Sequence, residues 1–564
     1  MRTIYILLTA IFISSTLHAQ TAPETLKNNS YADTVVWADA IYTANDDTPR
    51  VEAVAITMGR FAHVGTRLSS EAFIGPNTEI IDLTGSTVFP GFTDAHAHLS
   101  GIGQRELSLN LEQVSSLKEL KDTIADWRTN HPDQTAIIGR GWIETHWPEK
   151  RFPSRWDIDE VIADLPVILT RADGHALVAN SAALKAANIT ALTPVPFGGA
   201  ITKNALGEIT GMIVDNAQSL ISPILPKETT ADLEQYLTTG GEVYSRFGWT
   251  GVHNMSVSWP QVEAIEALAN NGALKIRVYN SVDQNEASTL FQSGPRTTEN
   301  GKAITRAIKL YMDGALGSRG AALIESYSDA NTDGLMLSTK EELMPILIEA
   351  LEGGYQVNTH AIGDRANRLL LDWYQEAFSA VPASNRTIEN PRWRDEHTQI
   401  VNLDDIVRYK QLGIIPSMQP SHAIGDMHFA PARLGDSRLN GAYAWSTLIN
   451  SGVIIAGGSD APVERGEPLI EFYAATSRRD LNGFQGENWH PEEALTREET
   501  LKMFTLWPAI ASFQEDKIGS IEVGKQADLS AFNIDLMTVI ESDIPKGKAT
   551  MTMVAGDVIY RATN

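Results

Sequence analysis

The sequence predicts an α/β fold, a (β/α)8 barrel of the TIM type flanked by a β-sandwich that is built from both chain ends. Between residues 88 and 460, apolar runs typical of strands alternate with amphipathic segments typical of helices, which indicates a parallel sheet. Eight strand candidates occur in this stretch, the number that a TIM barrel requires. The two chain ends instead carry short strands broken by Gly and Asp.

The first residues of the chain are typical of an export signal. Arg2 supplies a positive charge, residues 4–13 form an apolar run, and Leu17-His18-Ala19 is the expected cleavage site. A membrane anchor would need about 20 apolar residues, and this run is too short. We therefore expect residues 1–19 to be a signal peptide and the protein to be exported, to the periplasm or to the medium.

Similar strand patterns open and close the mature chain. VVWADAIYTA and EAVAITMGRFAHVGT follow the signal, and SIEVGKQADLSAFNID and KATMTMVAGDVIYRA lie near the C-terminus. We expect residues 20–88 plus 516–564 to form one β-sandwich domain. The barrel domain is expected over residues 89–515.

The barrel strands are expected in chain order. The candidates are STVFPGFTDAHAH, WTGVHNM, LKIRVYN, AIKLYMDG, YQVNTH, PRWRDEH, GIIPSMQ and GVIIAGGSD. The first two are separated by far more residues than an ordinary βα connection contains. A large insertion after barrel strand 1, over about residues 99–248, is therefore expected to form its own subdomain.

One helix between these strands shows the pattern clearly. In STKEELMPILIEALEGG, Ser338 and Glu341 predict a capping box, and apolar residues follow at helical spacing. Pro345 lies inside the segment and is expected to kink it. Thr496 and Glu499 predict a second capping box, before Trp507.

Composition and charge restrict the classes of partner. The chain has 45 Lys and Arg against 70 Asp and Glu, a net charge of -25, which repels nucleic acid and anionic membrane surfaces. We expect a small-molecule substrate, no nucleic-acid partner and no membrane span after signal cleavage, and we leave a homodimer open. Because the chain has no Cys, any metal must be held by His, carboxylate or Lys side chains.

Residues that can bind a metal fall at or near the C-terminal ends of five strand candidates, the face where barrel active sites lie. A lone His is more often a hydrogen-bonded core residue than a ligand. The recurrence of such residues at strand ends, in a chain with only 13 His, makes chance placement a poor explanation. The candidate metal ligands are His96, His98, Lys309, His360, His397 and Asp460.

Other polar and aromatic residues are candidates for substrate contact. They are Trp142, Asp173, His175, His253, Asp313 and Arg319. Each has an ordinary structural alternative: an Asp or His beside Gly usually belongs to a turn, His253 can cap the barrel mouth, and Trp142, like Trp147, can pack in the core of the insertion.

Nearly the whole mature chain resembles the amidohydrolase superfamily, and within it the family-3 or YtcJ-like group that includes N-substituted formamide deformylases. The stretches that carry the resemblance are PGFTDAHAHLSG, GWIETHWP, PVILTRADGHALVANSAAL, GMIVDNA, KLYMDGALGSRGAAL, THAIGDRAN, EHTQI, GSDAPV and VGKQADLSAFN. Together they are specific for the family and not for any one substrate.

The resemblance implies a binuclear metal centre. It places His96, His98 and Asp460 on one ion, His360 and His397 on the other, and a carboxylated Lys309 between them. Two divalent ions, with zinc as the first choice and Mn, Fe or Co as others, suit these ligands. A snorkelling or ion-paired Lys309, and ordinary turn chemistry at Asp460, are the alternatives.

The reaction expected from such a centre is hydrolysis of a C–N bond in an amide, formamide or cyclic amide, by attack of a metal-bridging hydroxide. Asp460 is then the catalytic general base and later the acid that protonates the leaving amine. The same scaffold also allows an ester or lactone hydrolase or a deaminase. An exported binding protein without catalysis is an alternative from a different class.

Overall fold

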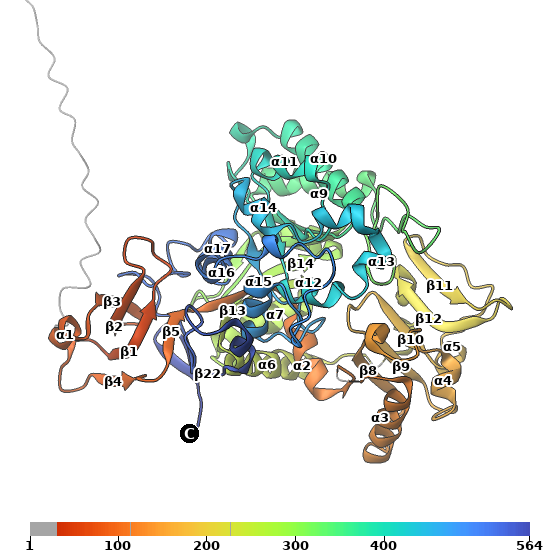
Figure 1. Cartoon of the computed structure of the whole chain (residues 1–564), viewed down its shortest axis with the longest axis horizontal. Helices are drawn as coiled ribbons and strands as arrows, with labels where there is room; N and C mark the ends of the chain where they lie inside the picture. The colour runs from red at the N-terminus through yellow and green to blue at the C-terminus, as the bar shows by residue number, and fades with distance from the viewer. Residues whose placement is uncertain (1–30, 113, 226, 564) are drawn as a thin grey trace, which may run out of the picture.

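Three β-sheets with surrounding helices make up the computed structural model, which describes residues 31–112, 114–225 and 227–563 (Figure 1). The predicted signal peptide, residues 1–19, lies outside the described residues. Within them, no helix combines the length and the apolar character that crossing a membrane requires. The barrel lies between the sheet of the chain ends and the sheet of the insertion (Figure 1).

Eight parallel strands form the barrel, and the count and order predicted from the sequence are confirmed. Each strand pairs with the next in the chain, from first to last. The strands are β6 (Phe92–Ala97), β13 (Trp249–Val257), β14 (Arg277–Asp283), β16 (Ala303–Tyr311), β17 (Gln356–Ala361), β18 (Arg394–His397), β19 (Ile415–Met418) and β20 (Ala456–Gly457).

The first and last barrel strands are joined mainly through Asp94 on β6. Its buried carboxylate accepts hydrogen bonds from the backbone N–H of Ser459 at 2.9 Å, from the Ser459 hydroxyl at 2.5 Å and from the Tyr244 hydroxyl at 2.8 Å. The Asp460 N–H also donates to the His96 carbonyl at 2.7 Å. These bonds fix the segment after β20 against β6, so residues at the two ends of the barrel sequence share one site.

Helices surround the barrel strands. They include α6 (Thr230–Phe247), α7 (Trp259–Asn270), α8 (Ala287–Ser293), α9 (Lys340–Gly353), α10 (Asp364–Ala380), α11 (Ile406–Leu412), α14 (Trp445–Asn450), α15 (Pro468–Ser477), α16 (Arg497–Met503) and α17 (Leu506–Ala511). The capping box predicted at Thr496 and Glu499 begins α16, as expected.

The start of α9 corrects the predicted capping box by one residue. Thr339 and Glu342 form the box, rather than Ser338 and Glu341, and the helix continues through Pro345. The segment STKEE satisfies the Ser/Thr-x-x-Glu pattern in two registers, so the pattern alone does not choose between them.

Strands from both chain ends combine in one eight-stranded sheet. The central junction is antiparallel pairing of β21 with β5, in which Ala531 lies opposite Val88. The Arg277 guanidinium on β14 donates to Asp528 at 2.6 and 2.9 Å, which ties this sheet to the barrel. The strands are β1 (Thr34–Tyr42), β2 (Arg50–Thr57), β3 (Arg60–Gly65), β4 (Glu79–Asp82), β5 (Thr87–Pro90), β21 (Leu529–Phe532), β22 (Ala549–Val554) and β23 (Asp557–Arg561).

The insertion after the first barrel strand has a six-stranded sheet of its own. Its strands are β7 (Leu109–Asn110), β8 (Ile137–Trp142), β9 (Val167–Arg171), β10 (Ala176–Ala179), β11 (Gly199–Lys203) and β12 (Ile209–Asp215). Helices α2 (Leu99–Leu107), α3 (Leu117–Asn130), α4 (Arg155–Asp159) and α5 (Ser181–Ala186) belong to the same segment. A separate hydrophobic core that includes Trp142 and Trp147 stabilises it.

Candidate active site

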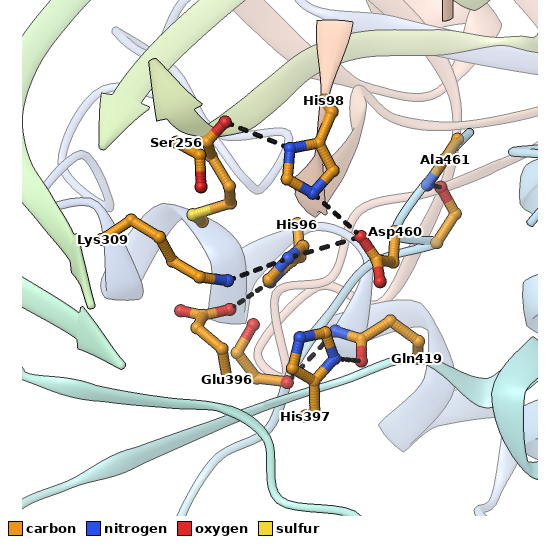
Figure 2. Close-up of polar contacts among 12 residues, drawn as sticks. His96, His98, Ser256, Lys309, Glu396, His397, Gln419, Asp460 and Ala461 are labelled. Atoms are coloured by element: carbon orange, nitrogen blue, oxygen red, sulfur yellow. Dashed lines mark hydrogen bonds and ion pairs between the residues drawn. The ribbon is translucent and has the colours of Figure 1, made fainter. Parts of the chain in front are cut away.

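The C-terminal ends of the barrel strands bring the six predicted metal ligands together. Figure 2 shows His96, His98, Lys309 and His397 around the carboxylate of Asp460. The Asp460 Oδ1 atom lies 3.2 Å from His98 Nε2 and 3.5 Å from His96 Nε2. His360 joins the group through His397, whose ring centroid lies 4.6 Å from its own.

His96, His397 and Asp460 are the tightest part of this group. All three are buried, and each offers one ligand atom that lies within 4.8 Å of the other two. An ion bound by imidazole nitrogen and carboxylate oxygen lies about 2.0–2.2 Å from each ligand, so these spacings allow one ion to contact all three. These side chains therefore fit a divalent cation.

The hydrogen-bond partners of His96, His98 and His397 favour metal binding. In each ring an oxygen acceptor engages Nδ1, so Nδ1 carries the proton and Nε2 keeps its lone pair. The acceptors are Glu396 Oε2 at 2.5 Å from His96, the Met255 carbonyl at 3.2 Å from His98 and Gln419 Oε1 at 2.8 Å from His397. Metal-ligating histidines are typically held in this way.

His360 presents a buried Nε2 atom that lacks a hydrogen-bond partner in the described part of the chain. Its nearest carboxylate oxygen is Asp313 Oδ1, at 3.5 Å. Leaving such a nitrogen without a partner costs about 1–3 kcal/mol, which a bound cation would offset. The orphaned nitrogen is a second observation that fits a metal centre.

Lys309 lies in the middle of the imidazole group. Only 1% of its surface is exposed, and its Nζ atom is 3.4 Å from His96 Nε2. Burial lowers the pKa of Lys309 to about 8, despite the nearby carboxylates of Glu396 and Asp460. About a tenth of the Lys309 side chains are therefore neutral amines at pH 7, and this fraction grows as the pH rises.

Asp460 remains a charged carboxylate at this position. Burial raises its pKa, but the adjacent His96 and His98 imidazoles outweigh that effect and hold the pKa well below its ordinary value. The residue adopts a left-handed backbone conformation with φ of 59°, which turns its side chain into the site.

Two buried residues of β18, Arg394 and Glu396, support the centre and were not identified from the sequence. Arg394 Nε lies 2.7 Å from Glu396 Oε1, and its Nη2 atom donates to Glu396 Oε2 at 2.9 Å and to the Ala95 carbonyl at 2.6 Å. Glu396 in turn holds His96. The pair therefore fixes the orientation of a metal-binding imidazole from inside the barrel.

A cavity of about 270 Å³ lies over the centre, between the barrel and the insertion. His360, His397 and Asp460 form its floor on the barrel side. Side chains of the insertion and of the segments after β18, β19 and β20 close the remaining sides, and they include Arg171, Asp173, His175, Gln399, His422 and Glu464.

Two of the predicted substrate contacts, Asp173 and His175, lie on this cavity wall. Buried Arg171 donates to Glu144 at 2.9 Å and also to Asp173, which fixes that carboxylate. His175 Nδ1 lies 2.7 Å from Asp215 Oδ1. Burial lowers the pKa of His175, but Asp215 and Asp173 outweigh burial and raise it to about 9.

The other four predicted substrate contacts lie outside the cavity lining. Trp142 donates to the Leu169 carbonyl at 2.8 Å inside the insertion core, and Arg319 pairs with Asp329 at 2.9 Å. His253 Nδ1 lies 2.8 Å from Arg394 in the barrel interior. Asp313 accepts three backbone hydrogen bonds, from the N–H groups of Ala322, Ile362 and Gly363 at 2.7, 2.9 and 2.8 Å.

Gln399, His422 and Glu464 were missed because they lie beyond the ends of their barrel strands, where the strand pattern stops. His422 belongs to α12 (Pro420–Asp426), which begins directly after the seventh barrel strand. No metal ligand was predicted at the end of that strand. A barrel strand end without a predicted ligand is the signal that could have directed attention to the segment containing His422.

A parallel barrel with imidazole, lysine and carboxylate side chains at its strand ends, arranged to fit a cation, defines a metal-dependent hydrolase. Comparison with known proteins gives the family: the model described as "Amidohydrolase family" matches residues 79–560. The chain belongs to this amidohydrolase family.

Individual relatives agree with this assignment. "Putative amidohydrolase YtcJ" of Bacillus subtilis (strain 168) is 32% identical over 92% of this chain and 98% of its own length. The N-substituted formamide deformylase of Arthrobacter pascens is 27% identical over 91% of this chain and 95% of its own. An uncharacterized metal-dependent hydrolase from Pyrococcus horikoshii OT3 has a similar structure, with a TM-score of 0.73, 26% identity, and coverage of 90% of this chain and 99% of that one.

Proposed function

We propose that this protein hydrolyses the C–N bond of an amide, a formamide or a cyclic amide, with two divalent ions as cofactors and zinc as the first choice. The observation that carries the proposal is the convergence of imidazole Nε2 lone pairs on the buried carboxylate of Asp460. Similarity to a formamide deformylase over most of the chain supports the choice of bond.

In this proposal His96, His98 and Asp460 hold one ion, and His360 and His397 hold the other. The ligand atom of His397, assigned to the second set, lies within 4.8 Å of those of His96 and Asp460, so the two sets are near enough to hold neighbouring ions. Such ions, when bound, polarise the scissile carbonyl and activate the attacking water.

We further propose that Lys309 carries a carbamate that bridges the two sets of ligands. The neutral amine nitrogen adds to the carbon of CO₂, a new N–C bond forms, and one proton leaves to solvent. The result is an anion with two ligand oxygens. Burial and the pKa of about 8 favour this product over a charged ammonium.

Asp460 is proposed to move the proton. Its Oδ1 atom faces His96 and His98, while its Oδ2 atom lies 3.7 Å from His422 Nε2 on the cavity side. A carboxylate in that position can take a proton from the attacking water and deliver it to the leaving nitrogen.

The test is release of amine, formate or ammonia from a panel of amides, formamides and cyclic amides, alongside matched esters and lactones. The Asp460→Asn variant is the control, and its kcat is expected to fall by about 10²–10⁴. Cleavage of esters or lactones without any C–N turnover would assign the other hydrolase class. Tight ligand binding without hydrolysis by metal-loaded protein would indicate a binding protein.

Export is proposed from the sequence of residues 1–19, with its charge at Arg2 and its short apolar run. Mass spectrometry of protein from the producing cell is expected to find a mature N-terminus at Gln20. Recovery of an intact Met1 from the cytoplasmic fraction would contradict this.

A further inference from the structure

His422 is a buried cavity residue to which no role has been given so far. It lies on α12, with 7% of its surface exposed, and it lines the cavity beside Asp460. The preceding Gln419 holds His397 through Oε1 and donates its Nε2 to the Ser417 carbonyl at 3.1 Å. One short connection therefore positions both a metal-binding imidazole and a second imidazole that faces the cavity.

The ring of His422 has the opposite polarity to the rings of the metal-binding histidines. Its Nδ1 atom lies 3.1 Å from the side-chain Nε2 of Gln399, an amide nitrogen that donates. His422 Nδ1 is therefore the acceptor and keeps the lone pair, and the ring proton belongs to Nε2. In His96 and His397 the partner of Nδ1 is an acceptor, so the proton is on Nδ1.

The Nε2–H group of His422 has no hydrogen-bond partner within the described residues. Its nearest acidic oxygens are Asp460 Oδ2 at 3.7 Å and Glu464 Oε1 at 3.9 Å, both beyond hydrogen-bond distance. A buried donor without an acceptor is unfavourable in the free protein. An oxygen atom of a ligand in the cavity would satisfy it, next to the proposed reacting centre.

A proton on Nε2 also argues against His422 as a further metal ligand, because coordination needs the lone pair of that atom. Arg171, another cavity donor, is held by its Nε, Nη1 and Nη2 atoms, which donate to Glu144 and Asp173. His422 is thus a cavity imidazole whose donor orientation is set by the neutral amide of Gln399 and whose Nε2–H is not engaged by any protein acceptor within the described residues.

We propose that His422 is a catalytic residue whose Nε2–H donates a hydrogen bond to the acyl oxygen of the substrate, with Gln399 as the positioning residue that sets its polarity. This role rests on the proposed C–N hydrolysis. As the carbonyl carbon is attacked, negative charge develops on that oxygen, and a fixed donor in a cavity shielded from water stabilises it.

The first experiment compares His422→Ala, His422→Gln and Gln399→Glu with wild type. His422→Ala is expected to lower kcat by about 10²–10³, as removal of a single oxyanion donor does elsewhere, with unchanged metal content. His422→Gln, which keeps an N–H donor, is expected to restore part of the loss. Gln399→Glu replaces the donor by an acceptor and draws a ring proton to Nδ1, so at a pH high enough for the ring to be neutral its kcat should resemble that of the Ala variant.

His490→Gln is the matched control, because His490 pairs with Glu492 away from the cavity and should leave kcat unchanged. An unchanged kcat in His422→Ala would overturn the proposal. So would loss of metal in step with loss of activity, since that result assigns His422 as a ligand.

A second measurement does not depend on turnover. Nitrogen NMR of zinc-loaded protein with labelled histidine, with the His422 signals identified by their absence in His422→Gln, is expected to show the Nε2–H form. The Nδ1–H form in wild type would overturn the proposal. If wild type cleaves no C–N bond, the proposed function fails, and binding of acetohydroxamate, which carries an acyl oxygen, decides on His422. Its Kd should weaken about tenfold in His422→Ala, and an unchanged Kd would overturn the proposal.

Discussion

The barrel floor and the insertion wall of the cavity are built differently. On the floor, His360 Nε2 has no hydrogen-bond partner within the described residues, and His96 Nε2 faces Lys309 Nζ at 3.4 Å and Asp460 Oδ1 at 3.5 Å. On the wall, Arg171 and His175 are closed into ion pairs with carboxylates. The floor is therefore open to a cation, whereas the wall is a fixed surface against which a substrate can be held.

The largest loss of metal and of activity is expected when Lys309, the lysine of the barrel floor, is replaced. Lys309→Ala should reduce the metal content from two ions to one and lower kcat by about 10²-fold or more, because the proposed bridging anion disappears. Elemental analysis with steady-state kinetics measures both. Unchanged metal and activity would show that Lys309 is only a buried amine.

Carboxylation of Lys309 is also expected to depend on pH. Because the pKa of Lys309 is lowered to about 8, the neutral amine becomes the major form as the pH rises through 8. Carboxylation of metal-free protein in bicarbonate, followed by carbon NMR, is expected to increase over that range and to be absent in Lys309→Ala.

Glu396 tests whether the floor depends on support from inside the barrel. Glu396→Gln should weaken metal affinity by about 10–100-fold, since His96 loses its charged acceptor. It also leaves buried Arg394 without its counter-charge, at a cost of about 3–5 kcal/mol in the free energy of unfolding. Metal titration and denaturant unfolding measure these effects separately, and unaltered metal affinity would contradict the positioning role.

Substitutions in the insertion wall are expected to change the free energy of unfolding rather than the metal content. The folded-state pKa of His175 is raised from 6.5 to about 9, so its pairing with Asp215 stabilises the fold fully below pH 6.5 and is lost as the pH rises through 9. In metal-free protein, Asp215→Asn should cost about 2–3 kcal/mol at pH 6 and little at pH 10. A difference that is independent of pH would contradict this linkage.

The smallest effect on stability and activity is expected for a residue outside both the barrel floor and the insertion wall. Arg319 pairs with Asp329 at a partly exposed position, so Arg319→Ala should change the free energy of unfolding by less than about 1 kcal/mol. Its kcat/KM should equal that of wild type on whichever substrate is active. A fall of about tenfold would place Arg319 in substrate binding after all.

The barrel could be predicted from the sequence because its strands are short apolar runs that recur in order, and each ends at a recognisable break. His96 and His98 were accessible for the same reason, because residues two apart on one strand share a face. The junction of the two chain ends followed from their matching strand patterns. These features depend on local periodicity.

The residues that position the metal-binding histidines could not be predicted from the sequence in the same way. The side chains of Arg394 and Glu396 point into the barrel interior. Because successive side chains of a strand point to opposite faces, strand alternation alone would place the His397 side chain outside the barrel. His397 reaches the cavity because its backbone is left-handed, with φ of 80°. The polarity of His422 depends on Gln399, far away in the sequence, and such a pairing has no periodic signal.

Pairing of β5 with β21 has a consequence for how the chain is made. The N-terminal strands leave the ribosome first, yet β21 and the Asp528 partner of Arg277 follow only after all eight barrel strands. Until then, one edge of the first sheet has no neighbour, and contacts of such high sequence separation form slowly. A chain truncated before Asp528 would leave an open strand edge that can pair with other chains, so premature termination of this protein should produce aggregates instead of a shortened enzyme.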